Sequence, residues 1–311
     1  MPLVAVHCAD PKFRRDHTKH VVALDDCLNC AATRDNECHF TYELLASMFE
    51  QQQDRPLDMI STTMLNTSCL RSEFLQRRLP FSENPEKLWA AFRGTMYHGQ
   101  LEQMAHGHSI AEARYVVELD GLGTVTGSPD LVDIQHGVLY DYKTTKENPK
   151  FGYPWGNHVE QNNINRWLVD HAHTVQYQGE DYDLSLPENR ATFVPKEWTS
   201  LVVVYMDDRG PKPITCTKSV QVPKADGKGT KAKRVPDIWD NDYAEAWIRD
   251  RYAYIQQVIA EEGIPPIPDN FVGWEHPLCG FCPKKKECIE LEYTGVIPTP
   301  VTLTTKSAPR G

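Results

Sequence analysis

The nine cysteines constrain the fold of this chain more than any other residue type. Six of them gather in two groups that each contain a Cys-x2-Cys pair, one at residues 27–38 and one at residues 279–288. An odd number of cysteines, in a chain of 311 residues whose start lacks the layout of an export signal, is typical of metal ligation. A disulfide scaffold is expected instead in small secreted domains. We therefore expect both groups to bind metal through thiolates.

The charge balance limits what the chain can bind through its overall electrostatic field. Lys and Arg number 33 against 43 Asp and Glu, which gives a formal net charge of −10. An acidic protein does not attract nucleic acid as a whole, so any DNA site must be locally basic. No apolar run approaches the roughly 20 residues that cross a bilayer. We expect a cytoplasmic protein with no membrane partner.

Hydrophobic periodicity predicts an α/β fold in which helices flank a meandering sheet. Helical patterns cover residues 41–53, 84–106, 158–172 and 240–262. Strand patterns cover residues 114–119, 138–145, 201–206 and 214–222. The last two strands are expected to pair with each other. The expected organisation is a Cys/His segment at 1–45, a main domain at 46–293 and a flexible tail at 294–311.

A pair of aspartates and a lysine form the central motif of the main domain. Pro129-Asp130 is followed, after ten further residues, by Asp141-Tyr142-Lys143. A turn centred between Gln135 and His136 would place Asp130 opposite Asp141, with Cβ atoms roughly 5 Å apart. Side chains alternate along a strand, so Asp141 and Lys143 point to the same face. Two carboxylates and one ammonium group are therefore expected to converge.

This convergence is typical of a divalent-metal site. Facing carboxylates repel each other unless a cation or a proton lies between them, and oxygen ligands suit Mg²⁺ or Mn²⁺. A neighbouring lysine can orient an attacking water, which points to phosphodiester hydrolysis. His98, four residues before Glu102 on one helix face, is a candidate third ligand, and Gln161 lies on the following helix. From spacing alone, a hairpin with a solvent-exposed salt bridge remains the alternative.

The order of these motifs resembles that of RecB-like exonucleases of the PD-(D/E)XK group. Gly94-x3-His98, Pro129-Asp130, Asp141-x-Lys143 and Gln161 occur in the family's order. The resemblance implies a restriction-endonuclease-like core with a mixed central sheet flanked by helices. It implies that His98, Asp130 and Asp141 bind the metal and that Lys143 serves the hydrolytic water. Asn165 stands where the family usually has tyrosine, which weakens the assignment of a role to Gln161.

A split set of cysteines surrounds these motifs. Cys279-x2-Cys282-x5-Cys288 supplies three thiolates, one fewer than a tetrahedral zinc or a four-cysteine iron–sulfur cluster requires. Cys69, ahead of the nuclease motifs, supplies the fourth if the two ends of the domain meet. Residues 61–290 thereby resemble the iron–sulfur branch of the RecB-like group, which includes AddB-type nuclease domains and the CRISPR-adaptation exonuclease family. The resemblance implies a 4Fe–4S cluster that closes the domain, with zinc at the same thiolates as the alternative.

The N-terminal cysteines predict a second metal site. Cys27-x2-Cys30-x7-Cys38, with Cys8 upstream, has the spacing of a zinc knuckle, and the adjacent His39 is a substitute ligand. We expect Cys8 and these three cysteines to bind zinc in a small metal-stapled unit without a large hydrophobic core. Free thiols on a polar arm are the alternative.

Two basic areas are candidate DNA contacts. Residues 225–233 are expected to form a mobile loop, and the candidate phosphate contacts in and beside it are Lys224, Lys228, Lys231, Lys233 and Arg234. A solvated, disordered insertion is an equally strong alternative. The second area joins the start of the main domain to its end if the cysteine cluster assembles, and comprises Arg71, Arg77, Arg78, Lys284, Lys285 and Lys286.

These patterns predict an Mg²⁺- or Mn²⁺-dependent DNA exonuclease that acts on DNA ends or single strands. The family resemblance implies work in recombination, repair or CRISPR adaptation, with an integrase or a recombination complex as a partner. The alternative is a non-catalytic or partner-dependent DNA-binding subunit of such a complex. The full His98, Asp130, Asp141 and Lys143 set favours catalysis, because a binding module does not need all four.

Overall fold

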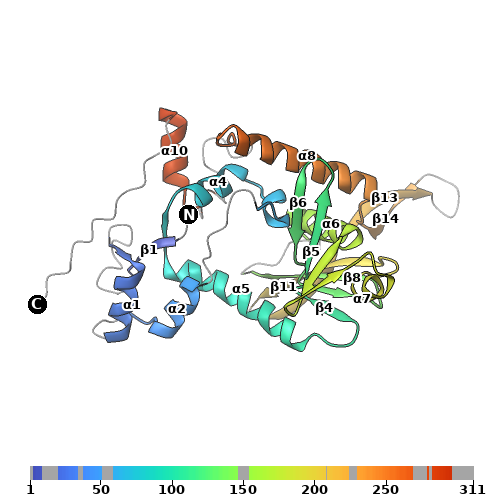
Figure 1. The fold of residues 1–311 in the computed structure, drawn as a ribbon, viewed down its shortest axis with the longest axis horizontal. Coiled ribbons are helices and arrows are strands. Elements are labelled where there is room, and N and C mark those ends of the chain that lie inside the picture. Colours follow the sequence, from blue (N-terminus) through green and yellow to red (C-terminus); the bar gives the residue numbers. More distant parts are fainter. Residues whose placement is uncertain are drawn as a thin grey trace, which may run out of the picture. The chain divides into compact units, whose positions relative to one another are not determined.

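The computed structural model describes residues 3–8, 20–33, 38–50, 59–145, 154–207, 209–223, 230–268, 279 and 282–295. The chain is a mixed α/β protein, as the sequence predicts, and it divides into two compact units (Figure 1). Unit 1 comprises Met1–Asp58, Cys69–Arg93 and Val258–Gly311, and unit 2 comprises Met59–Ser68 and Gly94–Gln257. This division differs from the expected boundaries at 45 and 293, because the N-terminal segment pairs with residues from later in the chain.

Unit 1 is built on a small three-stranded sheet. Its central strand β1 (Leu3–His7) pairs antiparallel with β2 (Val21–Ala23) and parallel with β3 (Phe81–Glu83). The described helices of this unit are α1 (Leu24–Thr33), α2 (Tyr42–Glu50), α4 (Leu70–Arg78), α10 (Lys285–Thr294) and the first half of α5 (Pro85–Met104).

The N-terminal segment has a hydrophobic core, so the expectation of a metal-stapled unit without one is wrong. Leu3 and Val6 of β1 are buried against Leu45 and Met48 of α2 and against Leu88 of α5. The sequence analysis missed this core because its members come from three elements that are separated in the sequence by polar residues. Apolar surface removed from water contributes about 25 cal/mol per Å², so this cluster stabilises unit 1 alongside any metal.

Among the described residues, unit 2 contains two larger sheets and a separate two-stranded sheet, β13–β14 (Thr217–Pro223 and Thr230–Pro236). The five-stranded sheet has the order β12 (Gly210–Thr215), β11 (Ser200–Asp207), β8 (Val138–Thr144), β7 (Leu131–Asp133) and β4 (Ser109–Ala111). The four-stranded sheet has the order β10 (Glu180–Asp183), β9 (Thr174–Tyr177), β5 (Arg114–Leu119) and β6 (Gly123–Gly127). In the larger sheet β8 lies parallel to β11 and antiparallel to β7, so the sheet is mixed.

Helices pack against these sheets. α6 (Gly156–His171) contacts strands of both larger sheets, and its residues 162–169 are all buried. Asn162 and Asn163, which are polar, are buried there because their side-chain amides donate to backbone carbonyls. The other described helices are α3 (Thr62–Leu65), α7 (Pro187–Phe193), the second half of α5 and most of α8 (Asn241–Ala260). The helices predicted over 84–106, 158–172 and 240–262 are therefore confirmed. Over the residues that the structure describes, no helix combines the length and apolar character that a membrane span requires.

The predicted register of the β7–β8 hairpin is confirmed. Leu131 pairs with Tyr140 and Asp133 with Val138, which continues to Asp130 opposite Asp141. The turn closes through the Gly137 amide, which donates to the Asp133 carbonyl at 2.9 Å. Gly137 has φ +63°, a left-handed conformation that glycine adopts without steric cost.

Two expectations on the chain after β11 are confirmed only in part. Residues 214 and 215 end β12, which pairs with β11 as predicted, but the strand is broken at Cys216, and the following β13 (Thr217–Pro223) pairs with β14 (Thr230–Pro236). The loop predicted over 225–233 is in its last part a strand, since residues 230–233 belong to β14. Pairing with β13 satisfies the backbone groups of this polar segment, and hydropathy alone does not reveal such pairing.

Gly137→Ala should destabilise unit 2 by more than the usual cost of placing alanine in a left-handed backbone conformation. A Cβ at Gly137 would lie 1.8 Å from the Glu197 carbonyl oxygen, which is backbone and cannot rotate away. We expect a loss of about 2–4 kcal/mol in the free energy of unfolding, measured by urea denaturation. The control is Gly121→Ala, where φ is +77° but no atom lies within 4 Å of the added Cβ, and where we expect about 1–2 kcal/mol. Equal losses would contradict the close packing at Gly137.

Candidate active site

Three carboxylates lie in a row across neighbouring strands of the larger sheet. β4 pairs with β7 so that Ala111 faces Leu131, which brings the next residues, Glu112 and Asp130, together. The Glu112 amide donates to the Asp130 carbonyl at 3.3 Å. The β7–β8 register places Asp130 next to Asp141 on the other side. Strands are spaced about 4.8 Å apart, so acidic groups in such a row lie close enough to share one cation.

His98 reaches this row from α5. Its Nδ1 lies 2.7 Å from Oε1 of Glu112 and 3.3 Å from Oδ1 of Asp130. The ligand atoms of His98, Glu112 and Asp130 all lie within 4.8 Å of one another. The structure thus brings His98 and Asp130 together, as their place in one predicted site requires, and adds Glu112, which the sequence analysis missed.

Glu112 has an unusual backbone for its residue type. Its φ is +55°, in the left-handed region, where a non-glycine residue is strained by about 1–3 kcal/mol. Such strain persists where the surrounding structure holds the residue in place, and it is found often at functional sites. The available sequence signal was a single acid between two alanines just ahead of the strand at 114–119. That signal does not show which strand β4 pairs with.

Asp141 is the most buried member of the row, with 1% of its side chain exposed. Its Oδ1 accepts a hydrogen bond from Lys143 Nζ at 2.7 Å, which confirms that the two side chains share a face. Its Oδ2 is buried and has no hydrogen-bond partner. Burial raises the pKa of Asp141 to about 7, the Lys143 ammonium opposes this rise, and the charge of Asp130 adds to it. A buried carboxylate oxygen without a partner is a position that a cation stabilises.

The groups next to Asp141, namely His98, Glu112 and Asp130, also favour a bound proton or cation. The Asp130 and Glu112 carboxylates, which accept hydrogen bonds from the His98 ring, raise the pKa of His98 to about 10, and burial raises the pKa of Glu112. Metal ligands must be deprotonated, so a cation bound here would displace the proton from His98. The Tyr142 amide donates to Oδ2 of Asp130 and holds that carboxylate in place.

A second group that the sequence analysis missed lies beside Lys143. His158 Nδ1 is 2.9 Å from the Tyr205 hydroxyl, which also accepts from the Trp155 amide at 3.1 Å. Burial and the charge of Lys143 lower the pKa of His158 to about 4, so this imidazole is neutral at pH 7. Gln161, one turn further along α6, is half-buried. In the described part of the chain, no hydrogen bond joins it to the site.

The thiols of the split cysteine set lie near enough to Cys69 in unit 1 to interact with it electrostatically. Burial raises the pKa of Cys69, and so do the nearby thiols of Cys282, Cys288 and Cys279. Cys69 precedes α4, which packs against α10, the helix that carries Cys288. The Ser72 hydroxyl lies 3.2 Å from Cys282 Sγ. None of the nine cysteines, all of which the structure describes, forms a disulfide.

Two members of the second basic area do not face solvent. Arg71 is buried and donates to the Pro265 and Cys288 carbonyls, while Lys284 is fully buried and donates to the Pro80 carbonyl at 2.6 Å. The expectation that both contact DNA is therefore wrong. Their charges instead bind backbone oxygens around the cysteine set, where buried cations need hydrogen-bonded partners.

The N-terminal cysteines lie near enough to Cys27 to interact with it electrostatically, and Cys27 and Cys30 stand on a helix rather than in a knuckle. Cys27 and Cys30 lie three residues apart on α1, which places them on one side of a helix. Burial raises the pKa of Cys27 to about 12, and the thiols of Cys38, Cys8 and Cys30 add to the rise. A bound cation would remove this repulsion between thiolates.

The candidate DNA contacts fall on and beside the β13–β14 hairpin. Lys231, Lys233 and Arg234 lie on β14, where all three are exposed. Lys224 and Lys228 lie outside the described residues.

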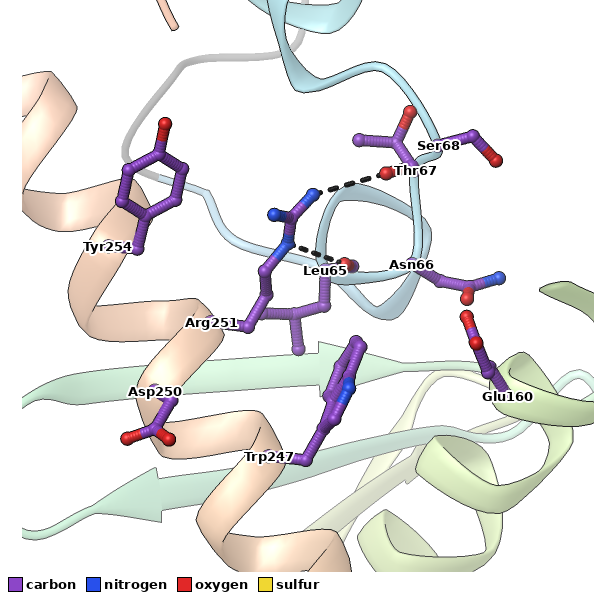
Figure 2. Close-up of a pocket in the computed structure, with 9 residues that line it drawn as sticks. All are labelled: Leu65, Asn66, Thr67, Ser68, Glu160, Trp247, Asp250, Arg251 and Tyr254. Carbon is purple, nitrogen blue, oxygen red and sulfur yellow. Dashed lines mark hydrogen bonds between the residues drawn. The ribbon is translucent and has the colours of Figure 1, made fainter. Parts of the chain in front are cut away.

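A separate open pocket of about 380 Å³ lies between α3, α6 and α8 (Figure 2). It is lined by Leu65, Asn66, Thr67, Ser68, Glu160, Trp247, Asp250, Arg251 and Tyr254. The Arg251 guanidinium donates to the Leu65 carbonyl at 3.0 Å and to the Thr67 carbonyl at 3.1 Å, as Figure 2 shows. These bonds satisfy carbonyls at the end of α3, and no predicted catalytic residue lines the pocket. We assign Arg251 a structural role.

Comparisons with known proteins find a distant structural likeness. No family model matches the sequence, and no curated protein matches it. Among solved structures, the chain is similar to one described as the crystal structure of SSO0001, with a TM-score of 0.45 and 15% sequence identity. The alignment covers 79% of this chain and 93% of that chain. A likeness this distant assigns no function.

Glu112→Gln should weaken metal binding although it preserves the shape of the side chain. The change removes one carboxylate charge from the group of ligand atoms that lie within 4.8 Å of one another. We expect the Kd for Mn²⁺ to rise at least about tenfold, measured by calorimetry. The control is Glu102→Gln on the same helix as His98, which removes the same charge from an exposed position. A loss of affinity in the control equal to that in Glu112→Gln would contradict the assigned ligand.

Proposed function

We propose that this chain is a metal-dependent DNA nuclease of the RecB-like PD-(D/E)XK type, in its iron–sulfur branch. The observation that carries the proposal is the state of Asp141. Its carboxylate is buried, with Lys143 on one oxygen and no partner on the other, beside the His98, Glu112 and Asp130 group. An exposed hairpin salt bridge, the alternative from the sequence, would not bury this carboxylate. The mixed sheet flanked by helices supports the same proposal.

The residues present fit a divalent cation. His98, Glu112, Asp130 and Asp141 would hold Mg²⁺ or Mn²⁺, since they combine carboxylate oxygens with one imidazole. When bound, the cation would supply positive charge to a phosphodiester and lower the pKa of a water molecule. Glu112 extends the set that the family resemblance implies.

Lys143 would act on the attacking water and on the phosphate. Its side chain is 24% exposed, so a water molecule or a phosphate oxygen can reach Nζ while Asp141 holds the ammonium group in place. There it can orient the attacking water and stabilise negative charge that develops on phosphorus. The neutral His158 adds no competing positive charge next to it.

We propose that the two cysteine sets bind different metal centres. For Cys69, Cys279, Cys282 and Cys288, we propose a 4Fe–4S cluster that closes unit 1 by joining segments more than 200 residues apart. A crosslink across so long a loop strongly restricts the unfolded chain. For Cys8, Cys27, Cys30 and Cys38, we propose structural zinc. Burial and the neighbouring thiols raise the pKa of Cys69 in one set and of Cys27 in the other, and binding of a cation would favour the thiolate form.

Lys143→Ala should abolish cleavage while the fold and the metal site remain. We expect the rate on end-labelled DNA with Mn²⁺ to fall roughly 10²- to 10⁴-fold, because the group that serves the water is lost. Lys196→Ala, at an exposed position of unit 2, is the control and should cleave at the wild-type rate. Wild-type protein that is folded and metal-loaded but never cleaves would favour the DNA-binding subunit instead.

Cys282→Ser should lower the iron content and the soluble yield together. The expected result, for protein purified without oxygen, is loss of the absorbance near 400 nm and about four fewer iron atoms per chain. Cys216→Ala changes the one cysteine outside both sets and should keep its iron. Zinc and no iron in the wild type would show that the four thiolates hold zinc.

A further inference from the structure

The β13–β14 hairpin stands apart from both larger sheets of unit 2. Its two strands pair with each other over seven residues and with no further strand among those described. Most of its residues are exposed, and in Figure 1 the strands extend outward from the rest of the unit. An isolated two-stranded hairpin buries little apolar surface and is marginally stable in water. A binding partner would supply the missing contacts.

The charge of the hairpin identifies the class of partner. The two strands carry Lys218, Lys231, Lys233 and Arg234 and no acidic residue, in a chain with a net charge of −10. Lys218 lies 3.5 Å from Asp237 at the base of the hairpin. The positive charge is therefore greatest on β14, towards the tip. A basic hairpin on an acidic protein is complementary to a polyanion.

The strand register sorts the basic side chains by face. Val220 pairs with Lys233 and Val222 with Lys231, so the two lysines lie on one face. Arg234 pairs with Ser219 and lies on the other face. Lys231 and Lys233 are two residues apart, which is about 7 Å along a strand. Phosphates two nucleotides apart on one DNA strand are separated by about the same distance along the duplex axis, since each nucleotide rises about 3.4 Å.

The hairpin fits a DNA duplex better than a single strand or an RNA duplex. Single-strand sites stack bases on aromatic side chains, and the described strands of the hairpin contain none. The major groove of B-form DNA, about 12 Å wide, admits a two-stranded β-ribbon. The major groove of an RNA helix is too narrow for side chains to enter.

We propose that the β13–β14 hairpin binds the backbone of double-helical DNA through Lys231 and Lys233, independently of sequence. DNA binding by the hairpin does not depend on the proposed nuclease function. Only the preferred substrate, given next, rests on that function. The hairpin would hold the duplex while one end of it enters the site around Asp141. The preferred substrate is then a duplex with a free end rather than a single strand.

The salt dependence of binding tests the hairpin without cleavage. Binding of a labelled 20-base-pair duplex is measured by fluorescence anisotropy in EDTA at several salt concentrations. For the double variant K231Q/K233Q, we expect the slope of log K against log salt to fall in magnitude by about 1.8, with roughly tenfold or more weaker binding near 100 mM salt. The control K87Q/K196Q removes the same charge from exposed positions elsewhere and should keep the wild-type slope.

Two outcomes would overturn the proposal. One is an equal slope for K231Q/K233Q and the wild type on the duplex. The other is a slope that changes on a single-stranded oligonucleotide and not on the duplex, which would assign the hairpin to single strands. Circular dichroism of both double variants shows that the fold is kept.

Hydrolysis of a small phosphodiester tests the catalytic site independently of DNA binding by the hairpin. Bis(p-nitrophenyl) phosphate carries no polynucleotide backbone for the hairpin to bind, so K231Q/K233Q should hydrolyse it with Mn²⁺ at the wild-type rate. Lys143→Ala should not hydrolyse it. If no form hydrolyses it while the slopes still differ, the nuclease proposal fails and DNA binding by the hairpin stands. If hydrolysis follows Lys143 and the slopes are equal, the hairpin proposal fails and the nuclease stands.

Discussion

The burial of one carboxylate between two strands governs the chemistry of unit 2. Asp141 lies in the middle of the larger sheet, where an isolated negative charge would cost several kcal/mol. Lys143 satisfies one of its oxygens and leaves the other without a partner. The neighbouring carboxylates of Asp130 and Glu112 add negative charge, which increases the need for a cation while providing ligands for it. His98 brings a fourth group from α5.

Local backbone conformations hold this arrangement in place. The left-handed Gly137 closes the turn that sets the β7–β8 register, and a slip by one residue would move Asp141 to the opposite face. The left-handed Glu112 lies where β4 ends and directs its carboxylate to His98. The strained Glu112 and the tightly packed Gly137 are thus linked, because both hold the same three strands, β4, β7 and β8, in place.

Unit 1 faces the same electrostatic problem with sulfur instead of oxygen. In each cysteine set, burial and the charges of neighbouring thiolates raise the pKa of one thiol, Cys27 in the N-terminal set and Cys69 in the split set. The buried Arg71 and Lys284 donate to backbone oxygens beside one set, so they hold the chain in place there. The hydrophobic core around Leu3 and Met48 means that unit 1 does not depend on metal alone.

The sequence by itself determined the features that depend on near neighbours. The β7–β8 register followed from one turn, the shared face of Asp141 and Lys143 followed from strand alternation, and the long helices followed from their periodicity. Only the tertiary structure decided which distant segments meet. Glu112 joined the site because β4 pairs with β7, and the basic segment became a hairpin because β14 pairs with β13. Three-residue strands and polar strands carry too little hydrophobic pattern to specify a partner, so their pairing is set by the packing of the whole unit.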